Sequence, residues 1–286
     1  MLSIRINRKE FIMKKFISLL SFEMNRFLKF LIPTFIAVAI IQLFDIFRIT
    51  MSYNSEVEQA IASGNTMEMP DLFNIHNITG GGFYELSVIG IILVFMVYSF
   101  FTWYREWLGK NTFIYRLLML PMNRSYIFLA KALVFLIGGF LAFVFQFGMY
   151  GLALYLSELL VPAEQYVALS IHNAQPMFSL VQGFLFPTSI FQFVSIYSFA
   201  FGALISLFTA IVIERTYRVK GLIAGIVYFV GYFVLYGLIV SLPYSGILPM
   251  VLKPSQGEII TLVYQFFMIV LGFMISWPLL KKRIKI

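Results

Sequence analysis

Residues 221–242 read GLIAGIVYFVGYFVLYGLIVSL and contain no charged side chain. This length and apolarity match the roughly 20 residues that an α-helix needs to cross a bilayer. Further apolar runs of this kind occur at 30–47, 83–104, 127–156, 184–213 and 259–280. The sequence therefore predicts an all-α membrane protein with six transmembrane helices. The transmembrane domain covers 30–280, between an N-terminal segment 1–29 and a basic tail 281–286.

The composition leaves little room for anything besides these spans. Hydrophobic residues make up 60% of the 286 residues and the mean hydropathy is +0.89, whereas globular proteins are roughly half apolar. Because no soluble catalytic domain fits, we expect no enzymatic activity. Cysteine is absent, which excludes disulfides and thiolate metal sites. His76 and His172 lie in separate loops without ligand spacing, so no metal site is expected either.

Lysine and arginine gather on alternate connecting segments. All but two of the 21 cations lie in 1–29, 105–131, 214–220 and the tail, and the exceptions are Arg48 and Lys253. Because cationic side chains resist translocation, the cation-rich segments are predicted to be cytoplasmic, with both termini inside. Anionic lipid headgroups, rather than nucleic acid, are the expected partners of these cations.

Residues 11–29 predict an amphipathic helix that lies on the membrane surface. Phe16, Leu19 and Leu20 fall on its apolar side, and Glu23 and Arg26 fall on the side expected to face water. The alternative is a simple extension of the first span. Residues 13–20 resemble the start of a signal peptide, but no small-residue cleavage site follows, so no cleavage is expected. Met1 and Met13 both remain possible starts.

The polar residues inside and between the spans carry few charges. Asp45 and Glu85 fall close to the outer span ends, where water is expected to reach them, so an ion-coupled carrier is disfavoured. The acidic outer segment 48–82 is expected to hold a short helix around 56–63. Uncharged groups at midspan either line a pathway or join helices by hydrogen bonds. They are Gln146, Gln192, Ser195, Ser198, Thr209 and Gln265.

Glycines recur along several spans and allow helix backbones to approach closely. They are Gly138, Gly139, Gly148, Gly151, Gly202, Gly221 and Gly225. Packing within one chain and a seam between two copies are both compatible with their spacing.

The most distinctive connecting segment is REWLGKNTFIYRLLMLPMNR at 105–124. It predicts a short amphipathic helix between Gly109 and Pro121, because proline cannot continue a helix without losing a hydrogen bond. Asn123 or Ser125 can then cap the following helix. The resulting apolar knob suits docking into a groove on another protein. Resting on lipid is the alternative.

This segment resembles the cytoplasmic loop of the ABC-2 type transporter permeases. The matching residues, in order, are Glu106, Gly109, Thr112, Leu117, Leu118, Leu120, Pro121, Arg124 and Lys131. Asn123 stands where those permeases commonly have serine or threonine, and asparagine caps a helix equally well. The six-span topology with both termini inside extends the resemblance to the whole chain.

The resemblance implies the permease subunit of an ATP-driven exporter, in a cell membrane that is expected to be the bacterial cytoplasmic membrane. Two copies of a separate ATPase subunit would use ATP and Mg, and this chain would bind no cofactor. A second permease, identical or paralogous, would complete the complex. The cargo would be a drug, peptide, lipid or glycan.

Within that complex, 106–124 would be the coupling helix and 11–29 the connecting helix. Glu106 and Arg124 would position the coupling helix, and Leu117, Leu120 and Pro121 would make the apolar contact with the ATPase. The rest of the predicted coupling site is Gly109, Thr112, Phe113 and Arg116. The alternatives are a sensor or immunity protein that transports nothing and, third, an ion-coupled carrier.

Overall fold

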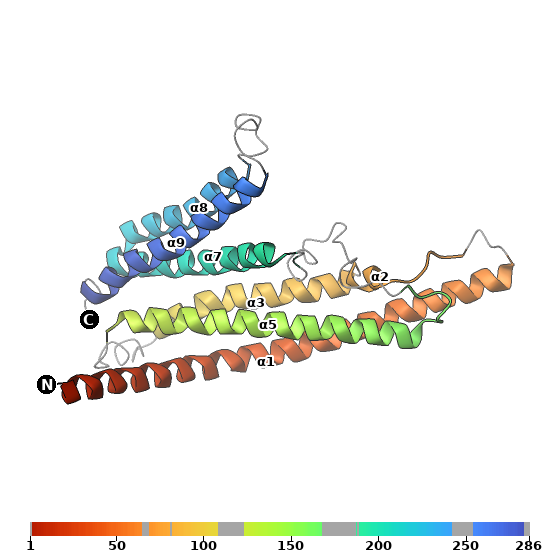
Figure 1. The fold of residues 1–286 in the computed structure, drawn as a ribbon, viewed down its shortest axis with the longest axis horizontal. Helices are drawn as coiled ribbons and strands as arrows, with labels where there is room; N and C mark the ends of the chain where they lie inside the picture. Colours follow the sequence, from red (N-terminus) through yellow and green to blue (C-terminus); the bar gives the residue numbers. More distant parts are fainter. Residues whose placement is uncertain are drawn as a thin grey trace. The chain divides into compact units, whose positions relative to one another are not determined.

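The structure, a computed structural model, describes residues 2–64, 69–80, 82–107, 123–167, 187, 189–241 and 254–282. These residues form seven helices: α1 (Leu2–Ser63), α2 (Ile75–Thr79), α3 (Gly82–Trp107), α5 (Ser125–Leu160), α7 (Ile190–Tyr217), α8 (Val219–Ser241) and α9 (Pro254–Lys282) (Figure 1). Within the described ranges there is no strand, only a single bridge between Phe73 and Tyr166.

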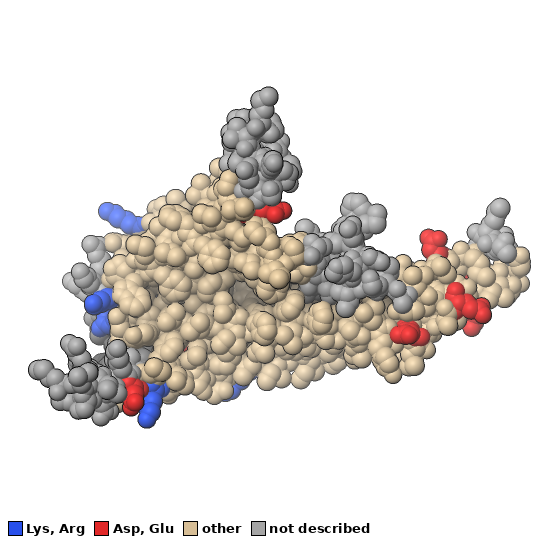
Figure 2. Space-filling model, in the orientation of Figure 1, with Lys and Arg blue, Asp and Glu red and all other residues tan. Residues whose placement is uncertain are grey.

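Six of these helices, all except α2, are long and apolar enough to cross a membrane. The prediction of an all-α fold with six apolar helices is therefore confirmed, and by length and composition the chain is a multi-pass membrane protein. Figure 2 shows a described surface formed largely by residues other than Lys, Arg, Asp and Glu. Many large apolar side chains are exposed, Ile40, Phe44 and Val97 among them, and exposed apolar surface is costly in water and favourable in lipid.

The first helix is longer than the sequence indicates. α1 runs without a break through 62 residues, with Pro33 inside it, and is about 93 Å long at 1.5 Å per residue. The connecting helix expected at 11–29 therefore does not end at residue 29, because α1 continues through it. Residues 56–63, expected to form a short separate helix, are the last turns of α1.

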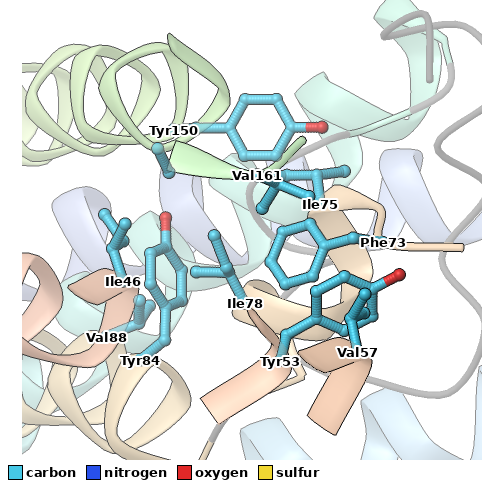
Figure 3. Packing of buried hydrophobic residues seen from close by; sticks show 11 residues of the cluster. Ile46, Tyr53, Val57, Phe73, Ile75, Ile78, Tyr84, Val88, Tyr150 and Val161 are labelled. Carbon is cyan, nitrogen blue, oxygen red and sulfur yellow. The ribbon is translucent and has the colours of Figure 1, made fainter. Parts of the chain in front are cut away.

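The chain divides into two compact units, and α1, α3 and α5 contribute to both. Unit 2 comprises Leu28–Met96 and Ile137–Thr188. Its largest apolar cluster contains Tyr53, Phe73 and Tyr84 among other buried residues (Figure 3). The Phe73 N–H donates to the Gln165 carbonyl at 2.8 Å, and the Val167 N–H donates to the Phe73 carbonyl at 2.9 Å. These two bonds hold the segment after α1 against the segment after α5.

Asp45 is a buried residue of unit 2, although the sequence suggested that water reaches it. Its side chain is 0% exposed. Oδ2 accepts the Tyr84 N–H at 2.9 Å, and Oδ1 accepts Arg48 Nη2 at 2.7 Å and Nε at 3.0 Å. Because Tyr84 lies in the first turn of α3, the carboxylate satisfies a backbone donor that the helix leaves open. That expectation was therefore wrong for Asp45.

Unit 1 comprises Met1–Phe27, Val97–Leu136 and Ser189–Ile286. In it α7, α8 and α9 pack against one another (Figure 1). A Cβ on Gly221 would lie 2.3 Å from the Ile213 carbonyl oxygen, and one on Gly225 would lie 2.7 Å from the Ala210 carbonyl oxygen. These two glycines therefore serve packing between α7 and α8 within one chain.

The other predicted packing glycines differ among themselves. A Cβ on Gly202 would meet the Tyr232 hydroxyl at 2.6 Å, so this glycine also serves packing within unit 1. In contrast, a Cβ on Gly139, Gly148 or Gly151 of α5 would have no neighbour within 4 Å among the residues that the structure describes. The packing role predicted from the sequence thus holds within this chain for some glycines only.

A single residue, Arg218, separates α7 from α8. Its φ of 56° and ψ of −126° form a conformation that favours glycine, and holding another residue in such a sparsely populated region costs about 1–3 kcal/mol. The Arg218 N–H donates to the Glu214 carbonyl at 2.8 Å and so closes the last turn of α7.

Candidate functional site: a buried charge cluster

Four charged side chains of unit 1 meet inside the protein, and we refer to them as the charge cluster: Glu23, Arg26, Glu106 and Lys131. Glu23 and Arg26 are three residues apart on α1 and therefore share a helix face. Glu106 belongs to the last turn of α3, and Lys131 lies near the beginning of α5. The two ends of the 106–124 segment are thus attached to helices that carry members of the cluster.

Lys131 is the centre of the cluster. Its Nζ donates to Glu106 Oε1 at 2.7 Å, to Glu23 Oε1 at 3.2 Å and to the Thr102 carbonyl at 3.1 Å. An ammonium group has three N–H donors, so these three acceptors satisfy it. The lysine thereby joins α5 to both α1 and α3.

Arg26 contacts the same two carboxylates at longer range. Its Nη1 lies 3.4 Å from Glu106 Oε1 and 3.7 Å from Glu23 Oε1. Each of the two cations is therefore shared between the same two anions. All four contacts use Oε1 atoms, and Glu106 Oε2 has no hydrogen-bond partner among the described residues.

Burial makes this pairing obligatory. The side chains of Glu106 and Lys131 are 0% exposed and that of Glu23 is 2% exposed, whereas Arg26 remains 20% exposed. An isolated charge buried to this extent would lose its hydration without compensation. Two acids and two bases make the cluster neutral, so the charges compensate one another.

Aromatic rings pack beside the cluster. The Trp103 ring centroid lies 5.5 Å from Lys131 Nζ, within cation–π range. Trp103 and Phe128 each pack against Phe208 of α7, with ring centroids 5.6 and 5.9 Å apart. Phe27, which follows Arg26 on α1, packs against Tyr98 of α3 and Phe135 of α5.

A second polar contact on α3 involves Tyr104, two residues before Glu106. The Tyr104 hydroxyl donates to Glu214 Oε2 at 2.6 Å, and the Arg215 guanidinium lies 4.8 Å from the Tyr104 ring centroid. α3 is thereby joined to the last turns of α7 as well.

The predicted coupling site lies largely outside the described residues. This applies to Gly109, Thr112, Phe113, Arg116, Leu117, Leu120 and Pro121. Glu106 is described and is the best-buried acid of the cluster, and Arg124 immediately precedes α5. The predicted cap is present: Asn123 Oδ1 accepts the Ser125 N–H at 3.3 Å.

The predicted connecting-helix residues are partly used for packing within the protein. Leu19 is buried, and the Phe16 ring lies 5.6 Å from the Tyr126 ring of α5. Leu20 is half-buried. Arg26 and Glu23 were both expected to face water, but they belong to the charge cluster, so that expectation was wrong for Glu23.

The polar residues predicted at midspan divide into two groups. Gln146 and Thr209 are buried and hydrogen-bonded: Gln146 Oε1 accepts from Gln42 at 3.1 Å, and Thr209 Oγ1 accepts from Ser276 at 3.1 Å. Both contacts join helices of the same unit, as the hydrogen-bonding alternative predicts. Gln192 and Ser195, in the first turns of α7, are half-exposed.

The sequence did not predict the role of Gln42. Its Nε2 donates to Ser87 Oγ at 2.9 Å and to Gln146 Oε1 at 3.1 Å, so it joins α1, α3 and α5 inside unit 2. A lone amide in an apolar run is the only signal that could have indicated it.

The described residues contain no group of three or more His, Asp or Glu side chains that could hold a metal ion. No protein-family model matches the chain, and neither the curated proteins nor the solved structures give a match.

Proposed function

We propose that this chain is the permease subunit of an ATP-driven exporter, with its energy supplied by a separate ATPase subunit. The observation that carries the proposal is the charge cluster at the base of the 106–124 segment. It joins α3, which precedes this segment, to α5, which follows it. A push on the segment would therefore move both helices together. The six apolar helices and the resemblance of the segment to the ABC-2 permeases support the same function.

In the proposed orientation both termini and the 106–124 segment are cytoplasmic. The distribution of lysine and arginine supports this orientation. Arg215, Arg218 and Lys220, at the junction of α7 and α8, then face the same compartment. Segment 48–82, which carries acids and almost no cations, faces the outside.

The proposed mechanism is mechanical. Two ATPase subunits bind ATP and Mg, close, and push on the apolar knob formed by Leu117, Leu120 and Pro121. Because Glu106 and Lys131 tie the two ends of the segment together at 2.7 Å, α3 and α5 tilt as one body. A second permease subunit, identical or paralogous, lines the pathway with this chain. The cargo is a drug, peptide, lipid or glycan that leaves the cytoplasm.

The first prediction concerns the docking contact. Leu117→Asp places a charge on the proposed apolar knob, so it should abolish both transport and recovery of the ATPase, with membrane insertion intact. The measurement is purification of the tagged chain in mild detergent, followed by quantification of bound ATPase and of cargo export. Leu72→Asp, the same change at a half-exposed position of unit 2, is the control and should behave as wild type.

Unchanged export by Leu117→Asp would contradict the docking assignment. Wild-type protein that retains no ATPase under these conditions would favour the rival function instead. In that function the chain is a membrane sensor or an immunity protein that binds a toxin without moving it.

A further inference from the structure

We propose that Glu23, Arg26 and Lys131 are positioning residues that lock the N-terminal part of α1 to both ends of the 106–124 segment. The part of α1 up to Phe27 then moves together with α3 and α5 when the segment is displaced. This inference rests on the proposed function, in which α3 and α5 tilt as one body, and it adds α1 to that body.

The geometry supports a shared attachment and not a single pair. Lys131 Nζ is 2.7 Å from Glu106 and 3.2 Å from Glu23, and Arg26 Nη1 is 3.4 Å and 3.7 Å from the same two acids. Each cation thus contacts an acid of α1 and an acid of α3, so the attachment of α1 does not depend on a single ion pair.

Stability alone does not account for the cluster. Aromatic packing between Phe27, Tyr98 and Phe135 and between Trp103 and Phe128 already joins the three helices nearby. A buried group of ion pairs is often no more stabilising than well-packed apolar residues of similar volume. The charges instead specify how α1, α3 and α5 are positioned, because only one arrangement of the three helices brings all four side chains together.

Contacts on α1 before the cluster show that its N-terminal part is held against α5. The rings of Phe16 and Tyr126 are 5.6 Å apart, and Leu19 is buried. If the cluster sets the position of this part of α1, loss of the cluster should loosen the contact between Phe16 and Tyr126. Contacts inside unit 2 should not change.

The absence of cysteine makes this testable by cross-linking. Phe16→Cys with Tyr126→Cys provides a reporter pair in unit 1, to be treated with a short bifunctional thiol reagent in native membranes. Phe35→Cys with Phe145→Cys, whose rings stack at 4.3 Å in unit 2, provides the matched control pair. Each pair is compared with and without Glu23→Gln combined with Arg26→Gln, which removes the α1 members of the cluster and leaves the pair of Glu106 and Lys131 intact.

The double change keeps the cluster neutral, because Glu106 and Lys131 remain as one acid and one base. The protein should therefore still fold, which a monodisperse peak in detergent checks. We expect cross-linking of the reporter pair to slow by about fivefold or more, the lower end of the coupling seen between linked sites. The control pair should cross-link at the wild-type rate.

A second measurement on the same variant is the amount of cargo exported per ATP hydrolysed. A positioning role predicts a fall of about fivefold or more in this ratio at an unchanged amount of bound ATPase. An unchanged reporter rate in folded protein would overturn the inference. Absence of a bound ATPase from wild type would instead overturn the proposed function, and the cross-linking result is independent of that outcome.

Discussion

The helices α1, α3 and α5 are joined by polar groups in two regions, and the two regions use different chemistry. In unit 1 the charge cluster joins them through acidic and basic side chains. In unit 2 Gln42, Ser87 and Gln146 join them through neutral hydrogen bonds of 2.9 and 3.1 Å. All three residues in unit 2 are buried.

The difference follows from the cost of each kind of group inside a membrane. Amides and hydroxyls need only a partner, and a hydrogen bond between transmembrane helices contributes about 0.6 kcal/mol on average. Charges need complete compensation, so they form a neutral group, which lies near the end of α3 and the beginning of α5. The comparison therefore predicts large effects when the charge balance is broken in unit 1 and small effects when an amide is lost in unit 2.

The largest effect is expected for Lys131→Met. This change leaves Glu23 and Glu106 buried with only Arg26 between them, and breaking a buried ion pair costs about 3–5 kcal/mol. The measurement is thermal unfolding of the purified protein in detergent. Lys281→Met removes an exposed lysine near the end of α9 and should leave the unfolding temperature unchanged. Equal effects of the two changes would remove the distinction between the regions.

The next effects rank the two acids. Glu106→Gln should lower the free energy of unfolding by about 3 kcal/mol and Glu23→Gln by about 1.5 kcal/mol, the range for hydrogen bonds to charged groups. The order follows from the shorter contacts of Glu106 with both cations. Chemical unfolding of both variants checks the order. A reversed order would mean that Glu23 and not Glu106 is the main partner of Lys131.

A smaller effect is expected for Gln42→Leu. It removes the donor to Ser87 and to Gln146, and bonds of this type between membrane helices contribute at most about 1.7 kcal/mol. Unfolding in the same detergent measures the change. A loss of unfolding free energy as large as that of Lys131→Met would show that an unpaired neutral group costs as much as an unpaired charge in this protein.

The smallest effect is expected when both amides are replaced. Gln42→Leu combined with Gln146→Leu leaves no unpaired amide, and Ser87 Oγ still donates to the Tyr84 carbonyl at 2.6 Å. Replacing both partners of a buried hydrogen bond by apolar groups can be nearly neutral. The double variant should therefore unfold closer to wild type than Gln42→Leu does, and the reverse order would contradict this interpretation.

The sequence predicts the helices well and the contacts between distant residues poorly. Long apolar runs indicate helices by themselves, because a single segment must satisfy its own backbone hydrogen bonds in lipid. The six apolar helices were therefore predictable. Partners far apart in the chain were not, and Glu23 illustrates the reason. Its position on the helix face distinguishes apolar from polar surroundings, but it does not indicate a lysine 108 residues away.

Asp45 and the glycines teach the same lesson. Asp45 lies near the end of an apolar run, where water is the usual expectation, but it caps α3 from another helix. The sequence predicts close packing at both Gly221 and Gly148, and only the structure separates the glycine at a helix crossing from the one without a neighbour among the described residues. Of the two cap residues expected before α5, Asn123 or Ser125, it is Asn123 whose side chain accepts a backbone N–H, that of Ser125 at 3.3 Å.

The single-residue turn at Arg218 has a consequence for how the protein is made. Arg218 alone joins α7 to α8, and the two helices approach each other closely at Gly221 and Gly225. We therefore expect them to partition into lipid together, as a helical hairpin. Arg215, Arg218 and Lys220 would hold its tip on the side of synthesis. The strained backbone at Arg218 is thus the point where a growing chain reverses its direction.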